Sequence, residues 1–343
     1  MKSMKSSLAI LVLLILHSAC EQETISSSGM ADDHFHLYSD GQYMPVSVRG
    51  NLDKDKILVI IHGGPGGSGM VYRDQTMVDL VENECAVVYW DQRFAGNTQG
   101  AGGGSSLEDF SKDIFKLLSL IKTKYGEDKE IHLLGHSWGG FLAPWFLKEA
   151  KNQNLVTSWI QVGGAHDYRL NDSLTREMLL FYGQQELDAG KNEQDWQEIV
   201  DWCLENGFEG ADNAGQLNAF AHRAEDLIED INEGDIESLL PEFRNNRIAP
   251  ISHLINGLAS GIRDIDQPTY TLNSEEMLAE IKVPLFMMWG KYDFICPPAL
   301  MDHIRQYAGT NEIKEKIFLN SGHSPMMNEA NDFWNAVIDW MQK

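Results

Sequence analysis

The pentapeptide GHSWG, residues 135–139, holds a serine whose neighbours suit nucleophilic chemistry. It matches the pattern G-x-S-x-G, in which two glycines let the chain turn sharply from a strand into a helix. An apolar run over 131–134 precedes the turn, and a helical pattern follows it. A serine hydroxyl at such a turn becomes a nucleophile when a base removes its proton. We therefore predict that Ser137 is the nucleophile of an acyl-transfer reaction.

Two candidate partners for Ser137 follow it in the order acid, then histidine. Asp293 comes just after the apolar run 283–290, and His323 comes just after the next strand-like run. If these runs are parallel strands, their carboxyl ends share one edge of a sheet, where Ser137 also lies. We predict that His323 is the general base and that Asp293 orients it. Taken singly, Asp293 could instead cap a turn, and His323 could be a surface-loop histidine.

The glycine-rich stretch HGGPGGSG, residues 62–69, could hold backbone N–H groups against a negative charge. Acyl transfer places negative charge on the carbonyl oxygen, and preorganised N–H donors stabilise it. One donor is the N–H of the residue after the nucleophile, Trp138, and the other comes from a loop after an earlier strand. We predict Gly64 as this second donor, with His62 anchoring the loop.

A dinucleotide-binding loop is the alternative for the same stretch. Residues 64–69 also spell G-x-G-x-x-G, and Asp91 follows 22 residues later, about where a ribose-binding acid belongs. Pro65 inside the turn and a hairpin pattern before it argue against this interpretation. It also leaves the serine, aspartate and histidine without a role.

The remaining pattern predicts an α/β fold. Short alternating runs on either side of Asp40-Gly41 indicate a hairpin. Apolar, strand-length runs then alternate with helical patterns, which favours a mostly parallel sheet flanked by helices. We assign this core to 34–165 and 281–343. Residues 166–280 read as helices, with 25 acidic and 7 basic residues, and we predict that they form an inserted helical cap.

The first twenty residues have the pattern of a secretory signal. Two lysines precede a short apolar run at 8–16, and small residues precede Cys20. The ending resembles a bacterial lipoprotein box, so we expect residues 1–20 to be removed, Cys20 to be lipidated and 21–33 to be a flexible tether. The protein would then cross the bacterial inner membrane and be a membrane-anchored lipoprotein in the periplasm or at the cell surface. Plain secretion is the alternative.

The composition of the sequence excludes several kinds of binding partner. The formal net charge of −24 over 343 residues disfavours nucleic acid, which is itself a polyanion. Three scattered cysteines remain after Cys20, so no disulfide framework is expected. No H-E-x-x-H pattern is present and the histidines are scattered, so we predict no metal and no cofactor. The expected partner is a small-molecule or short-peptide substrate, and the oligomeric state is left open.

Five motifs in this order and spacing resemble proline iminopeptidases of the α/β-hydrolase superfamily. They are HGGPGG, WDQR, GHSWGG, WGKYD and SGH, and the resemblance covers about residues 50–165 and 280–343. It implies an α/β-hydrolase fold, Ser137 as nucleophile with Asp293 and His323, and a helical cap over the site. It also implies removal of N-terminal proline from peptides, with cap carboxylates binding the ammonium of the substrate.

The cap residues cannot be aligned with the family pattern. Glu225 and Glu229, with Asp226 and Asp230, are candidates for ammonium binding by their charge, and a solvated helix face is the alternative. After DQR the family continues with Gly-x-Gly-x-Ser, which this chain lacks. We expect Asp91 and Arg93 to form a buried structural pair near the oxyanion loop.

These observations predict a serine hydrolase with a Ser-Asp-His triad, acting as a proline iminopeptidase-like aminopeptidase. An esterase or lactonase would use the same triad and would need no cap carboxylate. A non-catalytic surface lipoprotein whose acidic cap binds a partner is a third hypothesis. It leaves the three residues of the triad unexplained.

Overall fold

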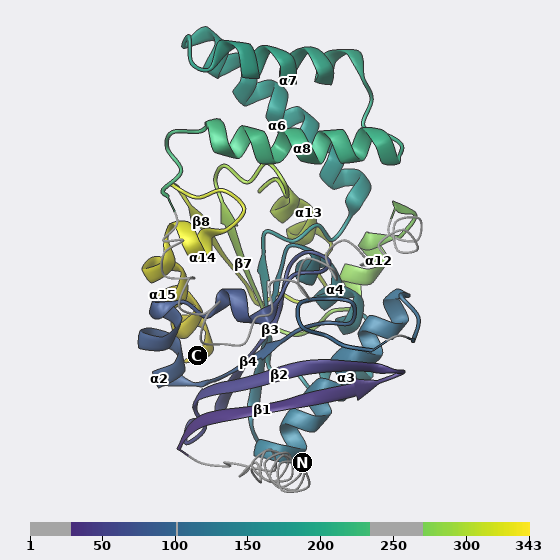
Figure 1. Cartoon of the computed structure of the whole chain (residues 1–343), viewed down its shortest axis with the longest axis vertical. Helices are drawn as coiled ribbons and strands as arrows, with labels where there is room; N and C mark the ends of the chain where they lie inside the picture. Colours follow the sequence, from purple (N-terminus) through teal and green to yellow (C-terminus); the bar gives the residue numbers. More distant parts are fainter. Residues whose placement is uncertain (1–28, 101, 234–269) are drawn as a thin grey trace, which may run out of the picture.

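The structure, a computed structural model, describes residues 29–100, 102–233 and 270–343 (Figure 1). The predicted signal peptide 1–20, its Cys20 and most of the tether lie outside the described residues. The first strand begins at Met30, so residues 30–33, which we expected in the tether, belong to the sheet. Within the described ranges, no helix combines the length and apolarity that crossing a bilayer requires.

One sheet of eight strands runs through the protein in the order β1-β2-β4-β3-β5-β6-β7-β8. The strands are β1 (Met30–Ser39), β2 (Gln42–Asn51), β3 (Lys56–Ile61), β4 (Ala86–Trp90), β5 (Glu130–His136), β6 (Ser158–Val162), β7 (Leu285–Gly290) and β8 (Ile313–Phe318). The pairs from β4 to β8 are parallel, and β1 and β2 add an antiparallel hairpin at one edge. The predicted α/β fold with a mostly parallel sheet is therefore confirmed.

The hairpin turns at the predicted residues. Asp40 has φ 50° and Gly41 has φ 88°, so both central residues are in the left-handed region that a tight hairpin turn needs. Ser39 pairs with Gln42 directly across the turn.

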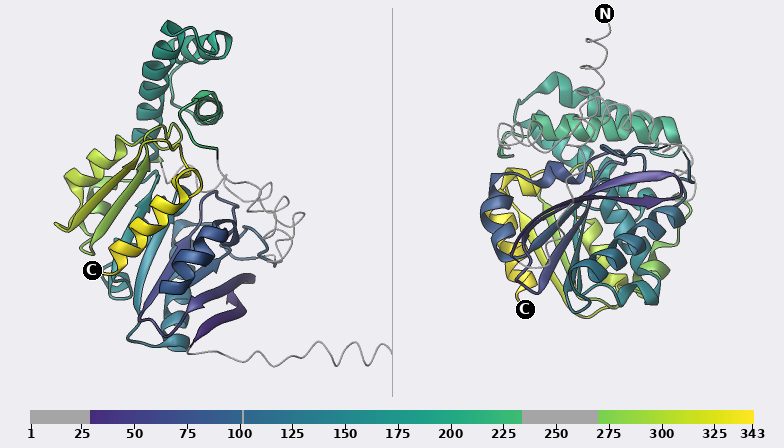
Figure 2. Two further views of the ribbon diagram at one scale, coloured as in Figure 1. Left: turned by 90° about the vertical axis from the view of Figure 1, so that its left-hand side faces the viewer. Right: turned by 60° about the horizontal axis from the view of Figure 1, so that its bottom comes forward.

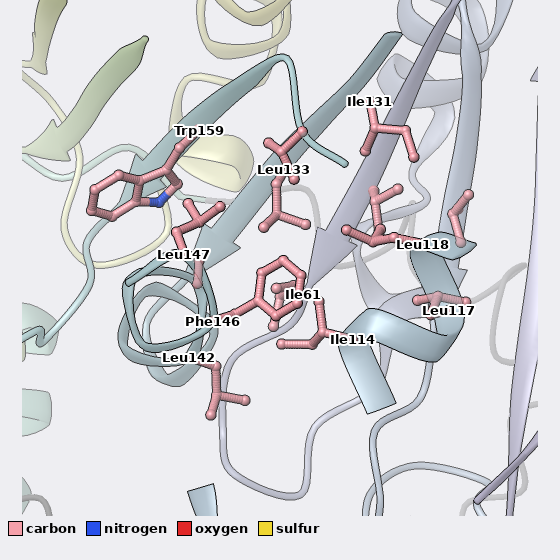
Figure 3. Packing of buried hydrophobic residues seen from close by; sticks show 14 of the residues in the cluster. Ile61, Ile114, Leu117, Leu118, Ile131, Leu133, Leu142, Phe146, Leu147 and Trp159 are labelled. Carbon is pink, nitrogen blue, oxygen red and sulfur yellow. The ribbon is translucent and has the colours of Figure 1, made fainter. Parts of the chain in front are cut away.

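Helices cover both faces of the sheet, which explains why the central strands are apolar throughout. They are α3 (Leu107–Tyr125), α4 (Trp138–Leu147), α5 (Ala150–Gln153), α12 (Ser274–Ala279) and α13 (Leu300–Tyr307), then η1 (Gly69–Tyr72), η2 (Met77–Val81), α2 (Glu82–Glu84), α14 (Pro325–Asn328) and α15 (Ala330–Met341). On one face, Ile61 and Leu133 of the sheet pack against Ile114 of α3 and Phe146 of α4 (Figure 3). Before β4, the chain forms the π-helical turn η2, which continues directly into the short α2.

Three helices between β6 and β7 stand over the carboxyl ends of the strands (Figures 1 and 2). They are α6 (Tyr168–Asp188), α7 (Glu193–Glu205) and α8 (Ala211–Leu227). These helices have their own apolar cluster, which includes Trp196 and Phe220. Tyr292 and Phe294, which flank Asp293 in the loop after β7, belong to the same cluster. The packing of the cap is thus coupled directly to the loop that holds a predicted catalytic residue.

Candidate active site

Ser137 lies at the sharp turn between β5 and α4. Its backbone has φ 55° and ψ −119°, a conformation that residues with a side chain rarely adopt. The two flanking glycines permit the turn. A Cβ on Gly135 would lie 2.4 Å from the carbonyl oxygen of Gly139, and a Cβ on Gly139 would lie 1.9 Å from that of Ile61. Because α4 packs directly on β3, the turn places Ser137, half-buried, at the carboxyl edge of the sheet.

The loops after β7 and β8 bring Asp293 and His323 together. The Nδ1 atom of His323 lies 3.0 Å from both carboxylate oxygens of Asp293. The Asp293 side chain is fully buried, and its Oδ1 accepts hydrogen bonds from the N–H groups of Ile295 at 3.1 Å and Cys296 at 2.7 Å. Gly163 makes room for the pair, since a Cβ there would lie 2.8 Å from Asp293 Oδ2. The orientation of the carboxylate is therefore fixed by the backbone.

The Asp293 carboxylate determines how His323 can act. Burial opposes a charged imidazole, but the charge and hydrogen bond of Asp293, together with the charge of Glu225, raise the pKa of His323 above its usual value. In the neutral ring, the carboxylate favours the proton on Nδ1, which leaves Nε2 as the basic nitrogen. This is the tautomer that a general base requires.

The loop after β3 lies against Ser137. A Cβ on Gly63 would lie 3.0 Å from the Cβ of Ser137. In the described part of the chain, no acceptor is hydrogen-bonded to the N–H groups of Gly64 and Trp138, the two predicted oxyanion donors. Free N–H groups beside a serine nucleophile are what a developing oxyanion needs.

The predicted anchoring role of His62 is confirmed. Its Nε2 accepts the backbone N–H of Gln92 at 3.1 Å, so Nδ1 holds the proton and donates to the carbonyl of Gly63 at 2.7 Å. The Gln92 side chain donates to the carbonyl of His62 at 2.9 Å and accepts the indole N–H of Trp138 at 3.1 Å. These bonds tie the glycine loop to the first residue of α4.

Glu225 of α8 is in direct contact with the two loops that hold Asp293 and His323. Its Oε1 accepts the backbone N–H groups of His323 at 3.0 Å and Phe294 at 3.2 Å. Burial, and then the negative charge of Asp293, raise the pKa of Glu225 to about 8. Glu229, just past the C-terminal end of α8, is exposed and pairs with Lys191 at 3.0 Å. The structure therefore places Glu225 beside the other predicted site residues and Glu229 away from them.

Comparison with known proteins decides the family. The family model described as the alpha/beta hydrolase fold matches residues 56–330. The chain belongs to the α/β hydrolase family.

Sequence relatives of this α/β hydrolase include proline iminopeptidases, and solved structures with a similar fold include an esterase. The chain is 27% identical over 297 residues to a proline iminopeptidase of Clostridioides difficile, covering 85% of this chain and 91% of that protein. The solved proline iminopeptidase of Mycobacterium smegmatis matches with a TM-score of 0.59 at 13% identity, covering 90% of this chain and 98% of that one. An esterase from Exiguobacterium antarcticum matches with a TM-score of 0.58 at 15% identity, covering 91% and 100%. The two structural likenesses concern the fold, and the protein is a hydrolase.

Asp91 and Arg93 are both buried, as expected, but they do not pair with each other and each is bonded to other residues. Asp91 accepts hydrogen bonds from the Ser68 hydroxyl at 2.6 Å and from the N–H groups of Gly69 at 2.9 Å and Asn97 at 2.8 Å. The carboxylate is buried beneath the glycine loop of the hydrolase, so it cannot reach the ribose of a dinucleotide.

Arg93 instead pairs with Asp113 of α3. Its Nε and Nη2 donate to the two oxygens of Asp113 at 2.6 and 2.9 Å, and neither side chain is exposed. The partner lies on a helix twenty residues further along the chain, which the strand-end motif DQR does not indicate. This buried pair joins the loop after β4 to the helix that covers it.

Asp113→Ala is expected to lower the free energy of unfolding of the hydrolase by about 3–5 kcal/mol. The substitution leaves the Arg93 guanidinium buried without its counter-charge. Urea unfolding followed by circular dichroism measures the loss. A double variant with Arg93→Met and Asp113→Leu removes both charges and should be more stable than Asp113→Ala alone. A loss below 1 kcal/mol in the single variant would contradict the role of the pair.

Two further residues at the site of this hydrolase were not predicted from the sequence. Tyr72 and His136 are buried side by side, with 2.7 Å between the Tyr72 hydroxyl and His136 Nδ1. His136 occupies the first variable position of G-x-S-x-G, and its proximity to Ser137 in the sequence was the available signal. Tyr72 had no such signal, because it reaches the site only through the position of η1.

Proposed function

We propose that this α/β hydrolase is a serine hydrolase with Ser137 as nucleophile, His323 as general base and Asp293 as the residue that orients it. We further propose that it is a proline iminopeptidase-like aminopeptidase that acts on small peptides. The observation that supports the chemistry most directly is the buried hydrogen bond between Asp293 and His323, at the same sheet edge as the Ser137 turn. The free N–H groups of Gly64 and Trp138 complete the set of groups that acyl transfer needs.

The proposed reaction has two steps. Nε2 of His323 takes the hydroxyl proton as Ser137 Oγ bonds to the substrate carbonyl carbon. The N–H groups of Gly64 and Trp138 stabilise the oxyanion. His323 then returns the proton to the leaving amine as the C–N bond breaks, which leaves an acyl-enzyme. Water repeats the sequence on this ester and releases the acid.

Glu225 supports the choice of a substrate with a free amino terminus. Its Oε1 is held by two backbone N–H groups, while in the described part of the chain no donor reaches Oε2. A half-buried carboxylate oxygen without a partner, beside the catalytic residues, suits a charged N–H donor from the substrate. An α-ammonium bound there would lie one residue away from the peptide bond to be cleaved, as an aminopeptidase requires.

The test is hydrolysis of proline 4-nitroanilide and 4-nitrophenyl acetate by the wild type and by Glu225→Gln. The glutamine keeps an oxygen for the two backbone N–H groups but presents an NH2 group to the ammonium. We expect KM for the proline amide to rise about 10–100-fold, since a charge-assisted hydrogen bond contributes about 1.5–3 kcal/mol. Turnover of the ester, which has no ammonium, should change little. Asp226→Asn, the exposed neighbour on the same helix, is the matched control and should behave as the wild type.

The dependence on pH gives a second signature of the same contact. Because the pKa of Glu225 is about 8, the carboxylate is lost as pH falls through 8, and KM for the proline amide should rise. Glu225→Gln should lose this dependence. Hydrolysis of the ester without the amide would contradict the aminopeptidase assignment and favour an esterase. An unchanged KM in Glu225→Gln would contradict the role of Glu225.

A further inference from the structure

Three buried hydrogen bonds connect the glycine loop to the loop of the catalytic histidine. The N–H of Gly63 donates to the Tyr72 hydroxyl at 3.0 Å. The hydroxyl lies 2.7 Å from His136 Nδ1, and His136 Nε2 lies 2.9 Å from the carbonyl oxygen of His323. Tyr72 and His136 are each only 7% exposed, so water does not compete for these bonds.

The donor and the acceptor of each hydrogen bond in this series can be deduced. The carbonyl of His323 can only accept, so His136 Nε2 must hold a proton and donate it. Burial, and then the nearby His323, lower the pKa of His136 to about 3, so its ring is neutral and Nδ1 has a lone pair. Tyr72 therefore donates its hydroxyl proton to Nδ1, and its oxygen accepts the N–H of Gly63. The Gly63 N–H, the Tyr72 hydroxyl, the His136 ring and the His323 carbonyl are therefore all hydrogen-bonded in one arrangement.

This arrangement fixes the peptide that contains the predicted oxyanion donor. Tyr72 holds the N–H of Gly63, while the ring of His62 holds the carbonyl of Gly63 at 2.7 Å. The Gly63–Gly64 peptide is not among the cis bonds, so its N–H points opposite to its carbonyl. Because the N–H and the carbonyl of Gly63 are both hydrogen-bonded, the orientation of the Gly63–Gly64 peptide is fixed, and with it the direction of the Gly64 N–H. Gly63 itself cannot serve as an oxyanion donor, because its N–H is already bonded to Tyr72.

The fold positions both Tyr72 and His136. Tyr72 ends η1, which Ser68 caps by accepting the N–H of Met70 at 3.2 Å, and Ser68 is in turn held by Asp91. His136 is the last residue of β5, directly before Ser137 in the chain. Its ring centroid is 4.8 Å from that of His323. A neutral ring at this distance does not repel the imidazolium that forms during catalysis.

We infer that Tyr72 and His136 are positioning residues, and that this Tyr72–His136 relay fixes the oxyanion donor Gly64 relative to the His323 loop. Neither residue touches the reacting atoms. The inference rests on the proposed function, because it assigns the relay to acyl transfer at Ser137. It predicts that loss of the Tyr72 hydroxyl slows the reaction of Ser137 without weakening the binding of substrate.

The test is the rate at which a fluorophosphonate labels Ser137, which does not depend on knowing the substrate. Ser137 Oγ bonds to phosphorus as fluoride leaves, His323 takes the serine proton, and the phosphoryl oxygen occupies the oxyanion site. Tyr72→Phe should be labelled about 10–100-fold more slowly, since small displacements of catalytic groups have effects of about this size. On any substrate that the wild type hydrolyses, kcat should fall while KM is retained.

Tyr89→Phe is the matched control. Tyr89 is also buried in the same apolar cluster, and its hydroxyl donates to Glu82 at 2.8 Å, away from Ser137. The two variants should lose similar thermal stability, but only Tyr72→Phe should lose labelling rate. Equal labelling rates in Tyr72→Phe and the wild type, or equal slowing of the two variants, would overturn the inference.

A second variant tests whether the two residues act together. His136→Gln should slow labelling as Tyr72→Phe does, and the double variant should be slowed by less than the product of the two single effects. Independent, multiplying effects would overturn the relay. A wild type that is not labelled at Ser137 would instead overturn the proposed function and the inference with it. A labelled wild type with an unaffected Tyr72→Phe variant overturns the inference alone.

Discussion

Ser137→Ala is expected to lower kcat about a millionfold, which is the scale observed when a triad nucleophile is removed. The methyl group cannot form the acyl-enzyme, so His323 and the oxyanion donors have no covalent step to assist. The alanine loses only one half-buried hydroxyl, and the free energy of unfolding should therefore stay within about 1 kcal/mol of the wild type. Steady-state turnover, fluorophosphonate labelling and urea unfolding measure the three quantities.

Ser158→Ala is the matched control for the nucleophile. Ser158 also lies beside a histidine, with its Oγ 2.8 Å from His132 Nδ1, but it begins β6 at the opposite edge of the sheet. The hydroxyl also accepts the indole N–H of Trp340. Its substitution should leave turnover and labelling unchanged. Ser137→Ala could retain some labelling that is lost in the double variant Ser137→Ala, Ser158→Ala. That result would show that Ser158 is the labelled residue and would contradict the assignment of Ser137 as nucleophile.

The predictable part of this site depends on the parallel sheet. Ser137, Asp293 and His323 each follow a strand of the parallel sheet, and parallel strands end at one edge, so their convergence follows from the α/β pattern. The glycine loop follows β3 for the same reason. The local geometry of G-x-S-x-G was also readable, because the two glycines at 135 and 139 are needed wherever a helix packs so closely on the neighbouring strand.

The rest depends on tertiary packing that periodicity does not encode. Glu225 and Glu229 are four residues apart in the sequence, yet only the first contacts the His323 loop, because α8 ends at Leu227 and Glu229 lies beyond it, where it pairs with Lys191. Arg93 pairs with Asp113 on a helix that passes over it, and not with the aspartate two residues away. The relay through Tyr72 joins segments 64 residues apart, and no spacing rule links them.

The second large effect is expected for Asp293→Asn, which should lower kcat about ten-thousandfold. The N–H groups of Ile295 and Cys296 donate to Oδ1, so the amide will keep its oxygen on that side and turn its NH2 toward His323. Nδ1 then faces a donor and must accept, which moves the ring proton to Nε2. The nitrogen that should take the proton of Ser137 is thereby already protonated.

The pH profile separates this mechanism from a loss of folding. The carboxylate of Asp293 raises the pKa of His323, so its removal should lower that pKa. Because the base acts in its neutral form, the acid limb of kcat against pH should move to lower pH in Asp293→Asn. Glu225 is largely protonated below pH 8, so Glu225→Gln should move the acid limb less. If Asp293→Asn lowered kcat with an unshifted acid limb, Asp293 would not be setting the charge state of His323, and its role would be limited to holding the loop.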